Sequence, residues 1–191
     1  MSIVDIWMQN DWIVKILIMS LILVLVMACE KFYQYYFSYK HTKKLNEIQV
    51  LDEVDTLPEG FLKETLVDIK NFKGSSESLL NAFVGVKLDR YEQYMMRFVT
   101  FIGVIAVLSP MLGLIGTFIG VWHVFEGVGD LGLSDPSAMA KGIKEVLIDT
   151  MAGLVVAVIA MILYKFFEFL SLKNVSVFEE RIYKLLRGPD A

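Results

Sequence analysis

Three long apolar runs constrain this chain more than any other feature of its sequence. Residues 98–125 contain no Asp, Glu, Lys or Arg over 28 positions, and residues 16–29 and 150–164 form two further uncharged runs. About 20 apolar residues span a bilayer as a helix, because a helix satisfies its own backbone hydrogen bonds in lipid. We therefore predict an all-α membrane protein with three transmembrane helices, at about residues 12–30, 99–122 and 143–165.

The composition excludes several other classes of protein. The chain has 191 residues, of which 55% are hydrophobic, and its net charge is only −4. Intrinsic disorder requires low hydrophobicity and high net charge. A nucleic-acid partner is not expected, because the pI near 5.2 argues against a basic binding surface. A disulfide scaffold needs many cysteines, and Cys29 is the only one in the sequence.

A cleaved signal peptide is the alternative interpretation of the first run. Such a peptide begins with positive charge and ends at a small-residue cleavage site. Here Asp5 and Asp11 come first, and aromatic residues follow the run, so we predict a retained span. Aromatic residues commonly anchor spans at both membrane interfaces. Those near the ends of the first two spans are Trp7, Trp12, Phe32, Tyr33, Tyr35, Tyr36, Phe37, Tyr39 and Trp122.

The distribution of positive charge predicts the orientation. Residues 31–97 hold ten Lys and Arg and residues 165–191 hold five, which together make 15 of the 18 in the chain. Positive segments face the cytoplasm, so the N-terminus is expected outside and the C-terminus inside. The predicted organisation is an outward N-terminus and first span (1–30), a cytoplasmic helical insertion (31–97), a second span (98–122), a short outward loop (123–142), a third span (143–165) and a cytoplasmic helical tail (166–191).

The cytoplasmic segments also have helical patterns. Phe61, Thr65, Ile69 and Phe72 follow helical spacing, and residues 74–76 are expected to end that helix. Only one residue interrupts the pattern from 78 to 122, a proline at 110. We therefore expect one helix of about 45 residues, roughly 65 Å long, that extends from the second span into the cytoplasm.

The third span is expected to continue into the cytoplasm in the same way. Phe178, Ile182 and Leu185 form an apolar stripe on the tail, with Arg181 beside them. A stripe of this kind is usually packed against other helices.

The second span carries small residues at helical spacing. Gly116 and Gly120 form a G-x-x-x-G motif, and Gly113 and Thr117 lie on a neighbouring stripe. Small residues let helix backbones approach closely in lipid. Pro110 removes the backbone hydrogen bond to Ala106 and is expected to kink the helix.

The third span carries a matching stripe, formed by Thr150, Gly153, Ala157 and Ala160. Each of the two spans therefore offers a narrow face with one hydroxyl on it. Simple helix–helix association is the alternative function of such a face.

Two acidic residues precede the third uncharged run. Glu145 and Asp149 are four residues apart and lie on one helix face. A charge at mid-bilayer costs roughly 2.5–3.5 kcal/mol, so an acid there is a candidate functional site. The alternative is that Lys141 and the outer headgroups keep both acids solvated.

Other signals are weak. Residues 127–132 match G-x-G-x-x-G but follow a membrane helix rather than a strand, so we expect a flexible outer turn instead of a nucleotide site. His41 and His123 are too far apart and too poor in partners for a metal site. We expect no cofactor and no metal, and no residues for enzymatic catalysis are visible.

Two strings resemble a known family. Pro110-Met-Leu-Gly-Leu-Ile-Gly-Thr-Phe-Ile-Gly-Val is similar to the second-span signature of the ExbB/TolQ/MotA proton-channel family. Gly142-Ile-Lys-Glu-Val-Leu-Ile-Asp-Thr-Met-Ala-Gly-Leu is similar to the third-span signature of its ExbB/TolQ branch. The order of the strings and the topology around them match as well.

The resemblance implies a motor stator of the bacterial inner membrane. Such proteins form pentamers around two copies of a single-span partner like ExbD or TolR, whose membrane aspartate carries the proton. Proton flow is thought to drive rotation that is passed to a TonB- or TolA-like protein. Thr117 and Thr150 match the family's pore threonines and Glu145 its acid, whereas Asp149 stands where the family usually has a small residue. The cytoplasmic insertion is shorter than in typical TolQ-like members.

Two other functions remain open at this point. A membrane scaffold would use the glycine faces only to assemble helices, and its cytoplasmic helices to recruit a partner. A small secondary transporter is less well supported, because three spans show no inverted repeat or broken helix pair.

Overall fold

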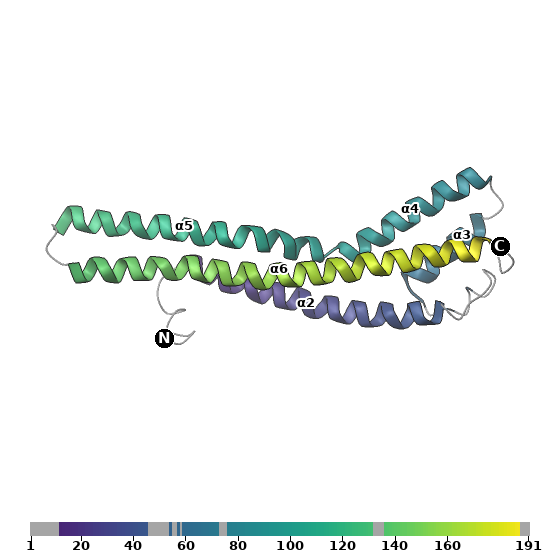
Figure 1. Ribbon diagram of the computed structural model, residues 1–191, viewed down its shortest axis with the longest axis horizontal. Helices are drawn as coiled ribbons and strands as arrows, with labels where there is room; N and C mark the ends of the chain where they lie inside the picture. Colours follow the sequence, from purple (N-terminus) through teal and green to yellow (C-terminus); the bar gives the residue numbers. More distant parts are fainter. Residues whose placement is uncertain are drawn as a thin grey trace. The chain divides into compact units, whose positions relative to one another are not determined.

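The computed structural model describes residues 12–45, 54, 57, 59–72, 76–131 and 136–187. Within these residues there is no strand, as the all-α prediction requires. The helices are α2 (Trp12–Leu45), α3 (Phe61–Phe72), α4 (Glu77–Met96), α5 (Val99–Leu131) and α6 (Pro136–Arg187), shown in Figure 1.

Three of the described helices are long and apolar enough to cross a membrane, over Trp12–Ser38, Val99–Glu126 and Gly142–Arg187. This confirms the prediction of three apolar helices. Large apolar side chains stay exposed along them: Phe118 is 75% exposed, Phe125 68% and Trp122 65%. Contiguous apolar exposure of this kind needs lipid or another protein surface to cover it. The chain is thus a multi-pass membrane protein.

The chain divides into two compact units. Unit 1 comprises Met1–Ala28 and Thr100–Lys165, and unit 2 comprises Cys29–Val99 and Phe166–Ala191.

Unit 1 is built from α2, α5 and α6. Helices α5 and α6 run side by side in opposite directions (Figure 1). Helix α2 packs Ile13 and Leu17 against both of them. The residues that meet this part of α2 are Ile105, Leu112 and Ile119 from α5 and Ala152 and Val156 from α6. The α5 residues recur every seven positions, so one stripe of that helix faces α2 along two heptads.

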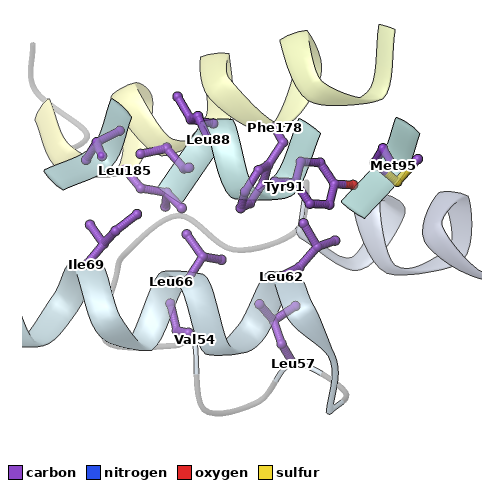
Figure 2. Packing of buried hydrophobic residues seen from close by; sticks show 12 residues of the cluster. Val54, Leu57, Leu62, Leu66, Ile69, Leu88, Tyr91, Met95, Phe178 and Leu185 are labelled. Atoms are coloured by element: carbon purple, nitrogen blue, oxygen red, sulfur yellow. The ribbon is translucent and has the colours of Figure 1, made fainter. Parts of the chain in front are cut away.

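Unit 2 has a conventional hydrophobic core (Figure 2). The predicted helix at residues 61–72 is confirmed as α3, and the apolar stripe on the tail packs against it and α4. Tyr91 of α4 is central, with its ring 4.8 Å from that of Phe178 and 5.7 Å from that of Phe61. The buried residues of this core are Val54, Leu57, Leu62, Leu66, Ile69, Val84, Leu88, Tyr91, Met95, Phe178, Ile182 and Leu185.

The continuous helix predicted from residue 78 to residue 122 is wrong. Helix α4 ends at Met96 and α5 begins at Val99. The carbonyl of Met95 accepts hydrogen bonds from the Lys31 ammonium, at 2.6 Å, and from the Ser171 hydroxyl, at 3.3 Å. A helix can end where side chains satisfy its last carbonyls. The break therefore depends on two residues that are far from it in the sequence.

Helix α5 continues through both of the features expected to disturb it, and the kink expected at Pro110 stays a prediction. Pro110 lies inside the helix and does not end it. The turn predicted at residues 127–132 is wrong as far as Leu131, because α5 continues to that residue. Glycine costs a helix only about 1 kcal/mol. The two glycines at 127 and 129 are therefore compatible with a helix that continues.

Candidate functional site

Helices α5 and α6 meet backbone to backbone along a line of glycines, which we call the α5–α6 seam. A Cβ atom added to Gly113 would lie 2.9 Å from the carbonyl oxygen of Asp149 and 3.1 Å from Cα of Thr150. A Cβ atom added to Gly153 would lie 2.6 Å from the carbonyl oxygen of Ser109. Because these neighbours are backbone atoms, they cannot swing away, and glycine is required for the helices to approach this closely.

The seam continues along both helices. Gly120 lies against the side chain of Val146, and Gly142 against that of Val124. On the other side of Gly153, Ala157 and Ala160 are buried.

Two members of this contact set were not predicted from the sequence. They are Gly142 and Gly103, whose added Cβ atom would lie 3.0 Å from the ring of Tyr164. A signal for Gly103 was available, because small residues recur every three or four positions from there to Gly120.

Asp149 is buried at this seam, with 7% of its surface exposed. It lies against Gly116 of α5: a Cβ atom there would be 2.7 Å from Oδ2 of Asp149 and 2.9 Å from its Cβ. The glycine at 116 therefore leaves the space that the carboxylate occupies. Sequence spacing placed Gly116 on a small-residue face of one helix and Asp149 on an acidic face of another. It did not predict that the two residues would be in contact.

The two threonines are half-buried, and both use their hydroxyl hydrogen within the chain. Thr150 donates across the seam to the carbonyl of Gly113, at 3.3 Å. Thr117 donates to the carbonyl of Leu114 in its own helix, at 2.7 Å. A hydroxyl has one donor and two acceptor lone pairs. Each threonine therefore keeps acceptor capacity for a donor from outside the chain.

Asp149 and Thr150 lie on opposite flanks of the seam. Successive residues of a helix are about 100° apart. On α6, Asp149 lies between the stripe that meets α5 and the stripe that meets α2 (Ala152 and Val156), and Thr150 lies on the far flank. On α5, Thr117 is likewise on the flank away from the residues that meet α2. The seam thus has a hydroxyl side and an acid side.

A pocket of about 320 Å³ opens on the acid side. It lies among all three helices of unit 1. Its lining residues are Trp12 and Ile13 of α2, Gly116, Ile119, Gly120 and His123 of α5, and Asp149 of α6. His123, for which no ligand role was expected, is the ionisable residue that shares this pocket with the acid.

Two other predicted residues, Glu145 and Pro110, lie on α6 and α5. Glu145 lies on α6 one turn before Asp149, and its side chain falls outside the described residues. Pro110 is half-buried within α5, next to the buried Ser109. Among the described residues, no group of three or more His, Cys, Asp or Glu side chains is arranged to hold a metal ion.

Comparison with known proteins places this seam in a family. The MotA/TolQ/ExbB proton channel family matches residues 53–180, which is two thirds of the chain and includes the whole α5–α6 seam. The chain belongs to the MotA/TolQ/ExbB proton channel family. This family is one of ion-channel components rather than an enzyme class.

Several relatives from this family carry the name ExbB. The biopolymer transport protein ExbB of Salmonella typhimurium is 26% identical over 87% of this chain and 78% of its own length. That of Neisseria gonorrhoeae is 29% identical over 66% of this chain and 63% of its own length. An ExbB homolog of Methanothermobacter thermautotrophicus is 52% identical over 31% of this chain, which amounts to 20% of its own length.

Proposed function

We propose that this chain is a stator subunit that couples proton flow across the bacterial inner membrane to mechanical work. One observation supports this most directly: Thr117 and Thr150, from two different spans, flank the α5–α6 seam on the same side, and both have spare acceptor lone pairs. A hydroxyl pair of this kind, in apolar surroundings, suits a proton carrier that passes along the seam.

The hydrogen bonds indicate which form of a carrier the threonines would favour. Because both hydroxyl hydrogens are engaged, the oxygens can accept a hydrogen bond more readily than they can donate one. A protonated carboxyl or a water molecule is a donor, whereas an ionised carboxylate is an acceptor only. We infer that the threonines steady the neutral form of a carboxyl that belongs to an ExbD- or TolR-like single-span partner.

The acids belong to the same pathway in this proposal. Glu145 and Asp149 precede Thr150 on α6, towards the end that the charge distribution places outside. Protons would enter near these acids and leave on the cytoplasmic side, where residues 31–97 and the tail are expected. The N-terminus is then outside and the C-terminus inside.

The exposed apolar surface supports assembly. Leu114, Phe118 and Leu154 are at least half exposed and lie on the hydroxyl side or the outer face of the seam. Neighbouring copies and the partner would cover this surface, as a pentamer around two partner chains. One charge that crosses 100 mV releases about 2.3 kcal/mol, enough to bias a two-state element if flow is coupled to movement. That movement would be passed to a TonB- or TolA-like protein.

A membrane scaffold that conducts no ions is the second candidate. The glycine contacts favour a scaffold, because they explain how the helices assemble without a role for the hydroxyls or the acids. The two functions differ in the role of the Thr117 and Thr150 hydroxyls, which take part in proton flow in the stator and not in the scaffold.

Native mass spectrometry of the chain in mild detergent, alone and with an ExbD-like partner, tests the assembly. Five copies that take up two partner chains are expected. A stable dimer that does not bind the partner would contradict the stator proposal and favour the scaffold.

Proton flux into proteoliposomes that contain both chains tests the pathway. Thr150→Val should abolish partner-dependent flux while the oligomer persists. Ser20→Ala is the matched control, because Ser20 lies on α2 and its hydroxyl donates to the carbonyl of Leu17 in its own helix. Flux that is intact in Thr150→Val would remove the threonines from the pathway.

A further inference from the structure

The pocket on the acid side of the seam combines three features that no helix-packing role requires. It contains a buried carboxylate, that of Asp149, and an ionisable imidazole, that of His123. A volume of about 320 Å³ far exceeds the roughly 10–15 Å³ that holds one water molecule. The pocket is therefore large enough and polar enough for water to reach the acid.

Small residues on α5 leave space for the side chain of Asp149. Gly116 leaves the space for the carboxylate, and the neighbouring Gly120 also lines the pocket. An ionised group buried in a membrane span is costly, and acids that persist there pair with other groups or mark an ion or proton site. A role in packing alone would be served as well by a small apolar residue at 149.

We propose that Asp149 is a proton-binding site within each subunit, served by water in the pocket among α2, α5 and α6. The ligand is a proton, delivered from the pocket rather than from the hydroxyl side. The site deepens the proposed function but needs no partner chain, so the two can fail separately.

Other ionisable residues near the pocket affect the titration of the Asp149 carboxyl. His123 lines the pocket itself. The remaining charged residues on the same stretches of helix are Lys15 on α2, Glu126 on α5, and Lys141, Lys144 and Glu145 on α6.

Labelling with dicyclohexylcarbodiimide tests the proposal on the purified full chain. This reagent adds to protonated carboxyl groups in apolar surroundings, and peptide mass spectrometry locates the adduct. An adduct at Asp149 is expected, with a yield at least tenfold lower at pH 9 than at pH 6, and none in Asp149→Asn. The absence of an adduct at Asp149 at every pH, while other carboxyls of the chain react, would overturn the site. Protection by Na⁺ at constant pH would overturn the assignment to a proton in favour of a sodium site.

Two further variants separate the pocket from general packing. Gly116→Ala puts a methyl group where the carboxylate lies and should reduce the yield severalfold, whereas Gly85→Ala, which meets no atom within 4 Å, should not. Trp12→Ala opens the pocket at a residue that is 56% exposed, so the fold should persist and labelling should become faster. Unchanged labelling in both Gly116→Ala and Trp12→Ala would show that the pocket does not serve the acid.

Thr150→Val distinguishes the two sides of the seam. Labelling of Asp149 should persist in this variant even if partner-dependent flux is lost. Loss of labelling together with flux would mean that Asp149 is reached from the hydroxyl side, which contradicts the proposal.

Discussion

The ammonium group of Lys31 donates a hydrogen bond of 2.6 Å to the carbonyl oxygen of Met95, in the last turn of α4. It makes a second bond of 2.6 Å to the side-chain amide oxygen of Gln34. Lys31 is only 3% exposed, so a cationic side chain is buried where it closes the end of a helix. The position of the α4–α5 break thus depends on a residue of α2.

Replacement of Lys31 by methionine tests this dependence. Lys31→Met keeps the length of the side chain but leaves the Met95 carbonyl with the weaker bond from Ser171. Hydrogen bonds to charged groups contribute about 1.5–3 kcal/mol, and relief of the buried charge offsets part of this. We expect unfolding in detergent to become easier by about 1–2 kcal/mol, measured by denaturant titration. Lys173→Met, at an exposed position of unit 2, is the control and should change stability by less than about 0.5 kcal/mol.

The glycine seam predicts a sharp difference between two glycine-to-alanine variants. In Gly153→Ala the new methyl group meets the Ser109 carbonyl and the backbone of Gly113, so the helices must move apart. Overpacking of this kind costs about 1–3 kcal/mol. Gly85→Ala meets nothing and should be neutral or stabilising by up to about 1 kcal/mol. Thermal unfolding in detergent measures both, and equal midpoints would contradict backbone contact at the seam.

The two threonines should differ in their contribution to stability. Thr150→Val removes a hydrogen bond between helices and should destabilise the chain by about 0.5–1.5 kcal/mol. Thr117→Val removes a bond to a carbonyl in its own helix and should change stability by a few tenths of a kcal/mol at most. Denaturant titration of both variants in one detergent provides the measurement. A larger loss in Thr117→Val would mean that its hydroxyl stabilises more than its own helix.

Stability at alkaline pH should depend on Tyr91. Burial raises the pKa of its phenol above the usual value near 10, although the 3.3 Å hydrogen bond with the Ser38 hydroxyl acts in the opposite direction. Below pH 10 the phenol is neutral in both states and adds no pH dependence. Above pH 10 the unfolded chain ionises first and holds fewer protons than the folded chain, so stability falls.

Tyr91→Phe should remove the part of the stability loss above pH 10 that comes from ionisation of the Tyr91 phenol. The free energy of unfolding of wild type, minus that of Tyr91→Phe, is expected to fall from pH 9 to pH 11, measured by denaturant titration. Tyr36→Phe, at a residue that is 72% exposed, serves as the control. A difference that stays constant over this range would show that Tyr91 ionises alike in both states.

Much of the helical architecture was predictable from local patterns. Three of the described helices are long and apolar enough to cross a membrane, and α3 and the apolar stripe on the tail appeared as predicted. The candidate site was predictable as a set of residue types, because small residues recur at three- and four-residue intervals. Which of these residues face one another was not predictable, since spacing defines a face of one helix but not its neighbour.

The sequence by itself determined that this chain forms three apolar helices, because local composition decides which segments enter lipid, and a helix there satisfies its own backbone hydrogen bonds. The tertiary structure decided where α4 ends, because the groups that satisfy the Met95 carbonyl come from Lys31 and Ser171. It also decided that Asp149 and Thr150, although adjacent, lie on opposite flanks of the seam. The residues that contact Asp149 and Thr150 belong to α2 and α5, and only the packing of the three helices brings them together.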